Sequence, residues 1–342
     1  MYFIGVDHHK QVSVMTVVDQ EGRELKTGRL PNRKKWVERF LEEFHPFTAV
    51  VEAGRSSYVM ADLLRELGGE VKMANALQVK AIAHARIKTD KRDSRTLAHL
   101  LRTDLIPEIY QREEGNRCGQ RVIRARAFWV RKKTEVANKI HALLSQQGEA
   151  VRLEVEKKKD GLFSQRGLGF LEALSLPGGD KVVLDDLVEG YRQIQGHIKK
   201  TDGAVEALYG EEAARIDTVP GFGKTLSVLM AVEIADISRF RRVEELHSYA
   251  GVVPSTYSSG ERTFHGRITK QGNAWVRWAA IEAVTPACQK DLGLRILYTR
   301  LARRKGSNVA KIAVARRLLT IIFRILTEKR DYLPGIKEYS AA

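Results

Sequence analysis

Acidic residues set into strongly apolar runs constrain this chain more than any other feature. Asp7 and Glu52 each end a short run rich in Ile, Val and Ala, the pattern of a buried strand. A carboxylate at the end of a buried strand is costly unless it binds a cation. Asp90 and Asp93 follow with i, i+3 spacing at the start of a predicted helix, which puts both on one helix face. The N-terminal fold must therefore accommodate acidic groups on two strands and one helix.

Residues 1–105 are predicted to form a mixed sheet with helices on its faces, the first domain of an α/β plus all-α chain. Three antiparallel strands are followed by strand–helix–strand units. Strands are expected at 2–6, 12–18, 24–30, 48–51 and 70–73, and helices at 32–44, 57–67 and 78–102, the last interrupted at 88–94. Acidic residues in the first strand, at the end of the fourth and on a later helix match a ribonuclease-H-like arrangement.

The rest of the chain is predicted to be mainly helical. Residues 106–208 contain two long helical patterns, at 117–144 and 184–208, whose sparse apolar positions suggest an antiparallel hairpin or a coiled coil. An ordinary helical bundle fits these patterns almost equally well. Residues 209–342 form a third predicted domain, with a loop-like stretch at 252–260 and a basic helical end.

The four carboxylates predict a divalent-metal site. Mg²⁺ prefers hard oxygen ligands, takes few of them from protein and completes its shell with water and phosphate. Mn²⁺ is the alternative ion. In phosphoryl transfer, bound metal ions stabilise the attacking and leaving oxygens. For Asp90 or Asp93 taken alone, a helix N-cap or a solvated surface carboxylate is an equally ordinary interpretation.

Charge points to a nucleic-acid partner. The chain has 58 Lys and Arg against 42 Asp and Glu, a net charge of +16, with a sequence pI of about 9.8. Such a balance favours DNA or RNA over a membrane surface. Two cysteines provide neither a disulfide framework nor a four-ligand zinc site. Neither a signal peptide nor a membrane-spanning stretch is visible, so a cytoplasmic, nucleoid-associated protein of a bacterium or archaeon is expected.

The segment Val219–Thr225 contains a Gly-x-Gly-Lys-Thr pattern with two interpretations. A Walker A loop would need glycine at position 218, which is Thr218, so that motif fails. A helix-hairpin-helix turn would expose backbone N–H groups to a DNA phosphate. An ordinary tight turn between helices remains the simplest alternative.

A candidate nucleophile lies in Ser258-Ser259-Gly260. The motif is weak by itself, because such a sequence usually marks a turn and a nucleophilic serine needs activation. Basic residues follow it closely and could stabilise charge on a phosphate. Upstream, a basic helix could follow a nucleic-acid backbone or could simply face solvent. Its cations are Arg117, Arg121, Arg124, Arg131, Lys132 and Lys133. His8 and His9 beside Asp7 could line the acidic site, and a surface role is as compatible with the sequence.

Taken together, these residues resemble the DEDD transposases of insertion sequences, whose relatives include Piv-type DNA invertases and bridge-RNA-guided recombinases. The resemblance spans nearly the whole chain and rests on the order of its motifs. These are Gly5–Asp7, Val51–Ala53, Lys88–Asp93, Asn138–Leu144, Pro220–Gly223, Tyr249–Pro254, Ser258–Gly260 and Thr269–Asn273.

The resemblance implies a RuvC-like domain at 1–105, a coiled-coil insert at 106–208 and a C-terminal transposase domain at 209–342. It implies that Asp7, Glu52, Asp90 and Asp93 hold Mg²⁺, and that a serine, Ser259 with Ser258 as the fallback, is the nucleophile. It further implies a homo-oligomer, dimer or tetramer, whose active site is completed between protomers. Its partners would be donor and target double-stranded DNA and a structured guide RNA that reads sequence by base pairing.

Two other functions are compatible with the residues. A RuvC-like metal-dependent endonuclease would use water as the nucleophile and leave the C-terminal domain as a DNA clamp. A non-catalytic nucleic-acid-binding protein would have no need of all four carboxylates. A covalent protein–DNA adduct distinguishes the serine enzyme from the nuclease.

Overall fold

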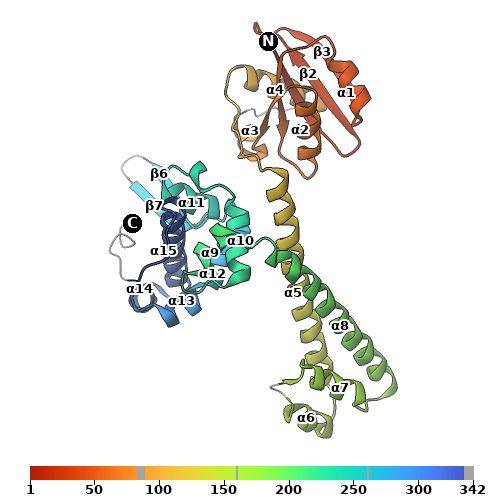
Figure 1. The fold of residues 1–342 in the computed structure, drawn as a ribbon, viewed down its shortest axis with the longest axis vertical. Helices are drawn as coiled ribbons and strands as arrows, with labels where there is room; N and C mark the ends of the chain where they lie inside the picture. The colour runs from red at the N-terminus through yellow and green to blue at the C-terminus, as the bar shows by residue number, and fades with distance from the viewer. Residues whose placement is uncertain (83–88, 159–160, 260–261, 335–342) are drawn as a thin grey trace. The chain divides into compact units, whose positions relative to one another are not determined.

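The computed structural model describes residues 1–82, 89–158, 161–259 and 262–334 (Figure 1). The chain divides into two compact units, Met1–Gln111 and Arg112–Ala342. Each unit has its own buried apolar core. The predicted boundary at 208/209 falls inside the second unit, so the three-domain division stays a prediction.

The first unit is built on a five-stranded mixed sheet with the strand order β3-β2-β1-β4-β5. β1 pairs antiparallel with β2 and parallel with β4, and β5 extends the parallel side. The predicted antiparallel strands followed by parallel units are confirmed. The strands are β1 (Tyr2–His8), β2 (Val12–Val18), β3 (Glu24–Pro31), β4 (Phe47–Glu52) and β5 (Glu70–Ala74).

Helices cover both faces of this sheet, because alternate residues of its strands are apolar on each side. Ile4 and Val6 of β1 pack into a core with α1 and α2, whereas Phe3 belongs to the core under α4. The expected helix at 78–102 is two helices, and residues 83–88 between them lie outside the described set. The helices are α1 (Lys34–Leu41), α2 (Ser57–Glu66), α3 (Ala76–Ile82) and α4 (Asp90–Arg102).

The second unit begins with two long helices that pack against each other, α5 (Glu114–Ser145) and α8 (Gly178–Glu206) (Figure 1). At their far end α6 (Glu149–Glu156) and α7 (Gln165–Ala173) join a small core centred on Leu144, Leu168 and Leu184. Both long helices were predicted from their apolar spacing, although α8 begins six residues before the expected 184. Whether their packing has coiled-coil geometry stays a prediction.

The remaining helices surround the largest core, which contains much of α10 and α15. Within the described residues no helix is both long and apolar enough to span a bilayer. The elements are α9 (Glu211–Asp217), α10 (Lys224–Ile234), η2 (Ile237–Arg239), α11 (Val243–Ala250), β6 (Pro254–Ser259), β7 (Arg262–Ile268), α12 (Ala274–Glu282), α13 (Val284–Lys290), α14 (Leu292–Lys305) and α15 (Ser307–Thr327).

Candidate active site

Two of the four carboxylates come from adjacent strands. β1 and β4 run parallel with Val6 opposite Val51, so Asp7 and Glu52 follow at the same end of the strand pair. Strand alternation puts Asp7 on the side of Phe3, away from Ile4 and Val6. That is the face of the sheet covered by α4. The predicted strand positions therefore lead both acids to one edge of the sheet.

The other two carboxylates lie in the first turn of α4. Thr89 is the N-cap of this helix, and its side-chain oxygen accepts the backbone N–H of Arg92 at 3.3 Å. Asp90 and Asp93 are therefore not the residues that cap this helix. Lys88, the first residue of this motif, lies outside the described residues.

A glycine allows α4 to lie close against β1. A Cβ built on Gly5 would lie 1.9 Å from the carbonyl oxygen of Ser94 and 2.4 Å from the backbone N of Ala98. Neither contact is sterically allowed, so the close approach of the helix to the strand depends on Gly5. A hydrogen bond of 2.8 Å between the Ser94 and Thr16 hydroxyls connects the same helix to β2. This packing brings the acidic turn of α4 to the edge that carries Asp7.

His9 is the basic group of this cluster. Its Nε2 lies 3.3 Å from Asp7 Oδ2 and 3.5 Å from Asp90 Oδ2. One ligand atom from each of the three residues lies within 4.8 Å of the other two. His8 instead contacts the hydroxyls of Ser13 and Ser56, at 2.9 and 3.0 Å. The sequence left the role of both histidines open, and the fold shows that His9 contacts the acidic residues whereas His8 contacts two serines.

The carboxylates interact electrostatically. Burial raises the pKa of Asp7, and the negative charges of Asp90, Asp93 and Glu52 raise it further, while His9 opposes them. The other three predicted acids are thus each close enough to Asp7 to raise its pKa. A set of oxygen donors that repel one another, with the Asp7 side chain 16% exposed and the Asp90 side chain 48% exposed, suits a hard cation that keeps some of its water.

The candidate serine lies on a β-hairpin. β6 and β7 pair antiparallel, with Ser258 opposite Thr263 and Ser259 opposite Arg262. The loop expected at 252–260 is therefore wrong for Pro254–Ser259, which is a strand. Gly260 lies outside the described residues, as do the side chains of 257–265. The choice of Ser259 over Ser258 stays a prediction.

Next to this hairpin, the segment Thr269–Asn273 leads into α12. Asn273 caps that helix, because its Oδ1 accepts the backbone N–H groups of Trp275 and Val276 at 2.9 and 3.2 Å. Its Nδ2 donates to Glu233 Oε2 at 2.8 Å. The motif that the sequence singled out is thus fixed at its end by a cap and by a carboxylate of α10.

Glu233 is a buried, ion-paired carboxylate that the sequence analysis did not identify. It is fully buried, and the guanidinium of Arg124 donates to its two oxygens at 2.7 and 2.9 Å. Gln120 donates to the same carboxylate at 2.8 Å. A buried charge is tolerated when it is paired and hydrogen-bonded in this way. The sequence feature that could have revealed this buried charge is a lone glutamate inside the apolar run of α10.

The Arg124 contact changes the expectation for the basic helix. Its charge faces a carboxylate of the same unit, so Arg124 is a structural residue of α5 and a poor candidate for contact with nucleic acid. The sequence could not show this, because Arg124 and Glu233 are 109 positions apart.

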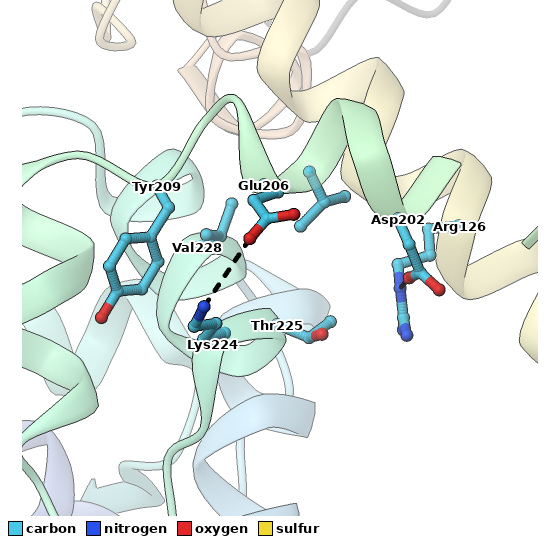
Figure 2. Close-up of a pocket in the computed structure, with 8 residues that line it drawn as sticks. Arg126, Asp202, Glu206, Tyr209, Lys224, Thr225 and Val228 are labelled. Atoms are coloured by element: carbon cyan, nitrogen blue, oxygen red, sulfur yellow. Dashed lines mark hydrogen bonds and ion pairs between the residues drawn. The ribbon is translucent and has the colours of Figure 1, made fainter. Parts of the chain in front are cut away.

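The Pro220–Gly223 turn joins α9 to α10, and Gly221 has a positive φ of 95°. Directly after this turn in the sequence, Lys224 and Thr225 line a pocket of about 300 Å³ together with residues of α5 and α8 (Figure 2). Lys224 lies 3.7 Å from Glu206, and Arg126 contacts Asp202 at 2.5 Å. Both cations at this pocket face carboxylates, which weakens its attraction for a phosphate. DNA contact at this turn stays a prediction.

Comparison with known proteins identifies the family. A model of DEDD transposases, described as Transposase, matches residues 4–148, and a model of the Transposase IS116/IS110/IS902 family matches residues 213–299. Together they cover more than half of the chain. The chain belongs to the IS116/IS110/IS902 family of transposases. The predicted resemblance is confirmed.

Two relatives of this transposase match along most of their length, and a third matches along less than half of it. A probable family 20 transposase of Pseudomonas aeruginosa is 24% identical over 97% of this chain and 98% of its own. The transposase for insertion sequence element IS1111A of Coxiella burnetii is 23% identical over 97% and 91%. A pilin gene-inverting protein of Moraxella bovis is 30% identical over 37% of this chain and 40% of its own. The four carboxylates of this transposase fall within the first family model, and Ser259 falls within the second.

Proposed function

We propose that this transposase cleaves and rejoins DNA through a metal-bound site of four carboxylates and a serine nucleophile. The carboxylates are Asp7, Glu52, Asp90 and Asp93, and the serine is Ser259. The observation that supports the metal site most directly is the effect of three carboxylates on the pKa of the fourth, Asp7. Such a cluster is unfavourable in the absence of a cation and has the donor chemistry of a Mg²⁺ site, with Mn²⁺ as the alternative.

The carboxylates and the serine would have different roles in the reaction. Bound Mg²⁺ would supply Lewis-acid stabilisation of negative charge on the reacting phosphate. The four carboxylates would hold the ion, and His9 would orient Asp7 and Asp90 through its Nε2. As the bond from the serine Oγ to phosphorus forms, a strand P–O bond breaks and the leaving oxygen takes up a proton. The covalent adduct conserves the phosphodiester energy, so strands can be rejoined without ATP.

Substitution of the acids tests the metal site. Asp7→Asn and Glu52→Gln should each abolish strand cleavage while binding of nucleic acid persists, because neither carboxylate is needed to attract phosphate. Glu38→Gln, on the exposed side of α1, is the control and should cleave normally. Full recombination by either acid variant would refute the metal-site assignment.

Trapping a covalent adduct tests the nucleophile. Wild-type protein should become attached to cleaved DNA, and Ser259→Ala should bind DNA but yield neither adduct nor recombinant product. Loss of activity in Ser258→Ala together with an active Ser259→Ala would move the role to the neighbouring serine. If cleaving wild-type protein never forms an adduct, a RuvC-like endonuclease that uses water replaces the recombinase.

The proposal includes two macromolecular partners besides DNA. The net charge of +16 fits binding of a structured guide RNA as well as DNA. Sequencing of the nucleic acids that co-purify with the protein should recover one discrete RNA species, and random fragments alone would exclude a dedicated guide.

The second partner is a further copy of the chain, with the long α5 and α8 helices as candidates for coiled-coil contacts. A mixture of the inactive Asp7→Asn and Ser259→Ala proteins should regain recombination if different protomers contribute to one reaction. No activity in the mixture, with both variants folded and binding DNA, would argue for a self-sufficient protomer.

A further inference from the structure

The end of the second unit carries an unbalanced charge. Residues 292–327, which form α14 and α15, contain nine Lys and Arg and not one Asp or Glu. The two helices pack against each other (Figure 1), and we refer to them as the basic hairpin. The nine cations are Arg295, Arg300, Arg303, Arg304, Lys305, Lys311, Arg316, Arg317 and Arg324.

Internal partners do not balance this charge. Among the described residues, Arg324 is the one cation of the basic hairpin with a carboxylate at ion-pair distance, Glu328 at 3.6 Å. Arg295 donates to the backbone oxygens of Cys288 and Gln289. Arg300, Arg303, Arg304 and Lys305 are exposed to solvent. The hairpin thus presents its charge outward.

Helix α5 shows that a basic sequence does not by itself leave cations without carboxylate partners. It contains eight Lys and Arg, and five of them form ion pairs within the unit. The pairs are Arg117 and Arg121 with Glu114, Arg124 with Glu233, Arg126 with Asp202, and Lys132 with Glu135. The fold therefore neutralises much of α5 and leaves the basic hairpin charged.

The helix dipole explains the positions of only some cations in the basic hairpin. Arg303, Arg304 and Lys305 occupy the last turn of α14, where the negative end of the helix dipole favours a cation. Arg300 lies three residues before Arg303 and four before Arg304, and like charges at these spacings on a helix repel each other. Lys311 lies near the positive N-terminal end of α15. An external polyanion would remove these unfavourable terms.

We propose that the basic hairpin binds the phosphodiester backbone of double-stranded DNA, away in sequence from the acidic site. Arg300, Arg303 and Arg304 share one helix face and provide three cations for successive phosphates. The hairpin contributes affinity and orientation and leaves base reading to other parts of the complex. The choice of DNA as the polyanion rests on the proposed function, whereas the surface itself rests on the charge and exposure of these helices.

The test is the salt dependence of binding. The Arg300→Gln, Arg303→Gln, Arg304→Gln triple variant keeps good helix formers at exposed positions and should fold normally. Its binding to a short duplex DNA of mixed sequence is measured in EDTA across a range of salt concentrations. The slope of log K against log salt should fall in magnitude by roughly 0.9 for each lost phosphate contact, or up to about 2.7 in total.

A matched triple variant controls for net charge. Lys132→Gln, Lys181→Gln and Arg192→Gln remove the same charge from helices of the same unit, but these three cations are paired with Glu135, Asp185 and Glu172. The control should keep the wild-type slope. Equal slopes for wild type and both variants, or equal losses in both variants, would overturn the proposal.

Parallel titrations separate DNA from RNA and binding from catalysis. A loss confined to structured RNA would overturn the assignment to DNA. Because the assay contains EDTA and scores only binding, failure of the metal or serine chemistry would leave its outcome unchanged. Conversely, a hairpin without effect on DNA binding would leave the cleavage tests of the acidic residues intact.

Discussion

At the scale of single residues, the ionised form of Asp7 in the acidic cluster opposes folding. The pKa of Asp7 is raised, so its ionised form is less stable in the folded chain than in the unfolded chain. At pH values above the folded pKa, the ionised group therefore opposes folding, and the opposition fades as pH falls through that pKa. A bound cation would reverse the balance, because it would bind the folded cluster and not the unfolded chain.

This balance predicts how metal changes the stability of the unit Met1–Gln111. Magnesium at about 100 times its dissociation constant should add about 2.7 kcal/mol to the free energy of unfolding of that unit. Asp7→Asn should raise its melting temperature in EDTA, because a repelling charge is gone, and should lose most of the magnesium response. Calorimetry with and without Mg²⁺ measures both effects. Glu38→Gln should respond as wild type does, and an undiminished response in Asp7→Asn would contradict the assignment.

His247 gives the second unit a pH dependence of its own. Burial and the charge of Arg316 lower the pKa of His247 to about 4, while its Nε2 donates to the Arg316 carbonyl at 3.1 Å. The unfolded chain binds this proton near pH 6.5 and the folded chain only near pH 4. Stability contributed by the neutral ring is therefore present above pH 6.5 and is lost as pH falls toward 4, by roughly 2–4 kcal/mol.

His247→Gln removes the titrating group and keeps an amide donor for the carbonyl. Denaturant unfolding at several pH values should show a smaller loss of stability between pH 6.5 and 4 in the variant than in wild type. Parallel pH profiles for the two proteins would show that His247 titrates normally in the folded chain.

At the scale of elements, the sequence predicts most of what positions the acids. Buried strands have short β-branched runs, so the sequence predicts β1 and β4 with Asp7 and Glu52 at or near their ends. A strand rich in serine and polar residues has no such run, so the sequence predicts a loop where β6 forms. Contacts between distant elements leave no periodic signal. That is why the role of His9 beside Asp90 and the pairing of Glu233 required the fold.

The contact of β1 with α4 gives a prediction for Gly5→Ala. Its Cβ would collide with the backbone of α4 at Ser94 and Ala98, so the helix must move away. We expect a loss of about 1–3 kcal/mol or more in the first unit, together with a weaker magnesium response, because α4 carries Asp90 and Asp93. Thermal unfolding with and without Mg²⁺ measures both.

Gly190→Ala in the middle of α8 is the matching control. Nothing lies within 4 Å of a Cβ at that position, so the substitution should stabilise the second unit by roughly 0.5–1 kcal/mol. If Gly5→Ala were as harmless as this control, the close packing of α4 on β1 would not position the acidic cluster.

At the scale of the whole molecule, charge is divided unequally between the two units. Met1–Gln111 contains 18 Lys and Arg against 15 Asp and Glu, a net charge of +3, whereas Arg112–Ala342 contains 40 against 27, a net charge of +13. The unit with the acidic cluster thus has little net attraction for phosphate. Electrostatic attraction of nucleic acid should come mainly from the second unit.

Ion pairs on the helices of the second unit indicate which of them provide that attraction. Glu135 on α5 interacts with Lys132, Arg131 and Lys139, which lowers its pKa and offsets part of their charge. An Arg131→Gln, Lys139→Gln double variant should therefore reduce the salt slope for duplex DNA by less than about 0.9, the effect of one lost phosphate contact. Arg124 is left intact, because its replacement would leave the buried Glu233 without its cation and would strongly destabilise the second unit. A reduction near 1.8 would instead mean that both cations contact phosphate and that α5 follows a nucleic-acid backbone, as its sequence first suggested.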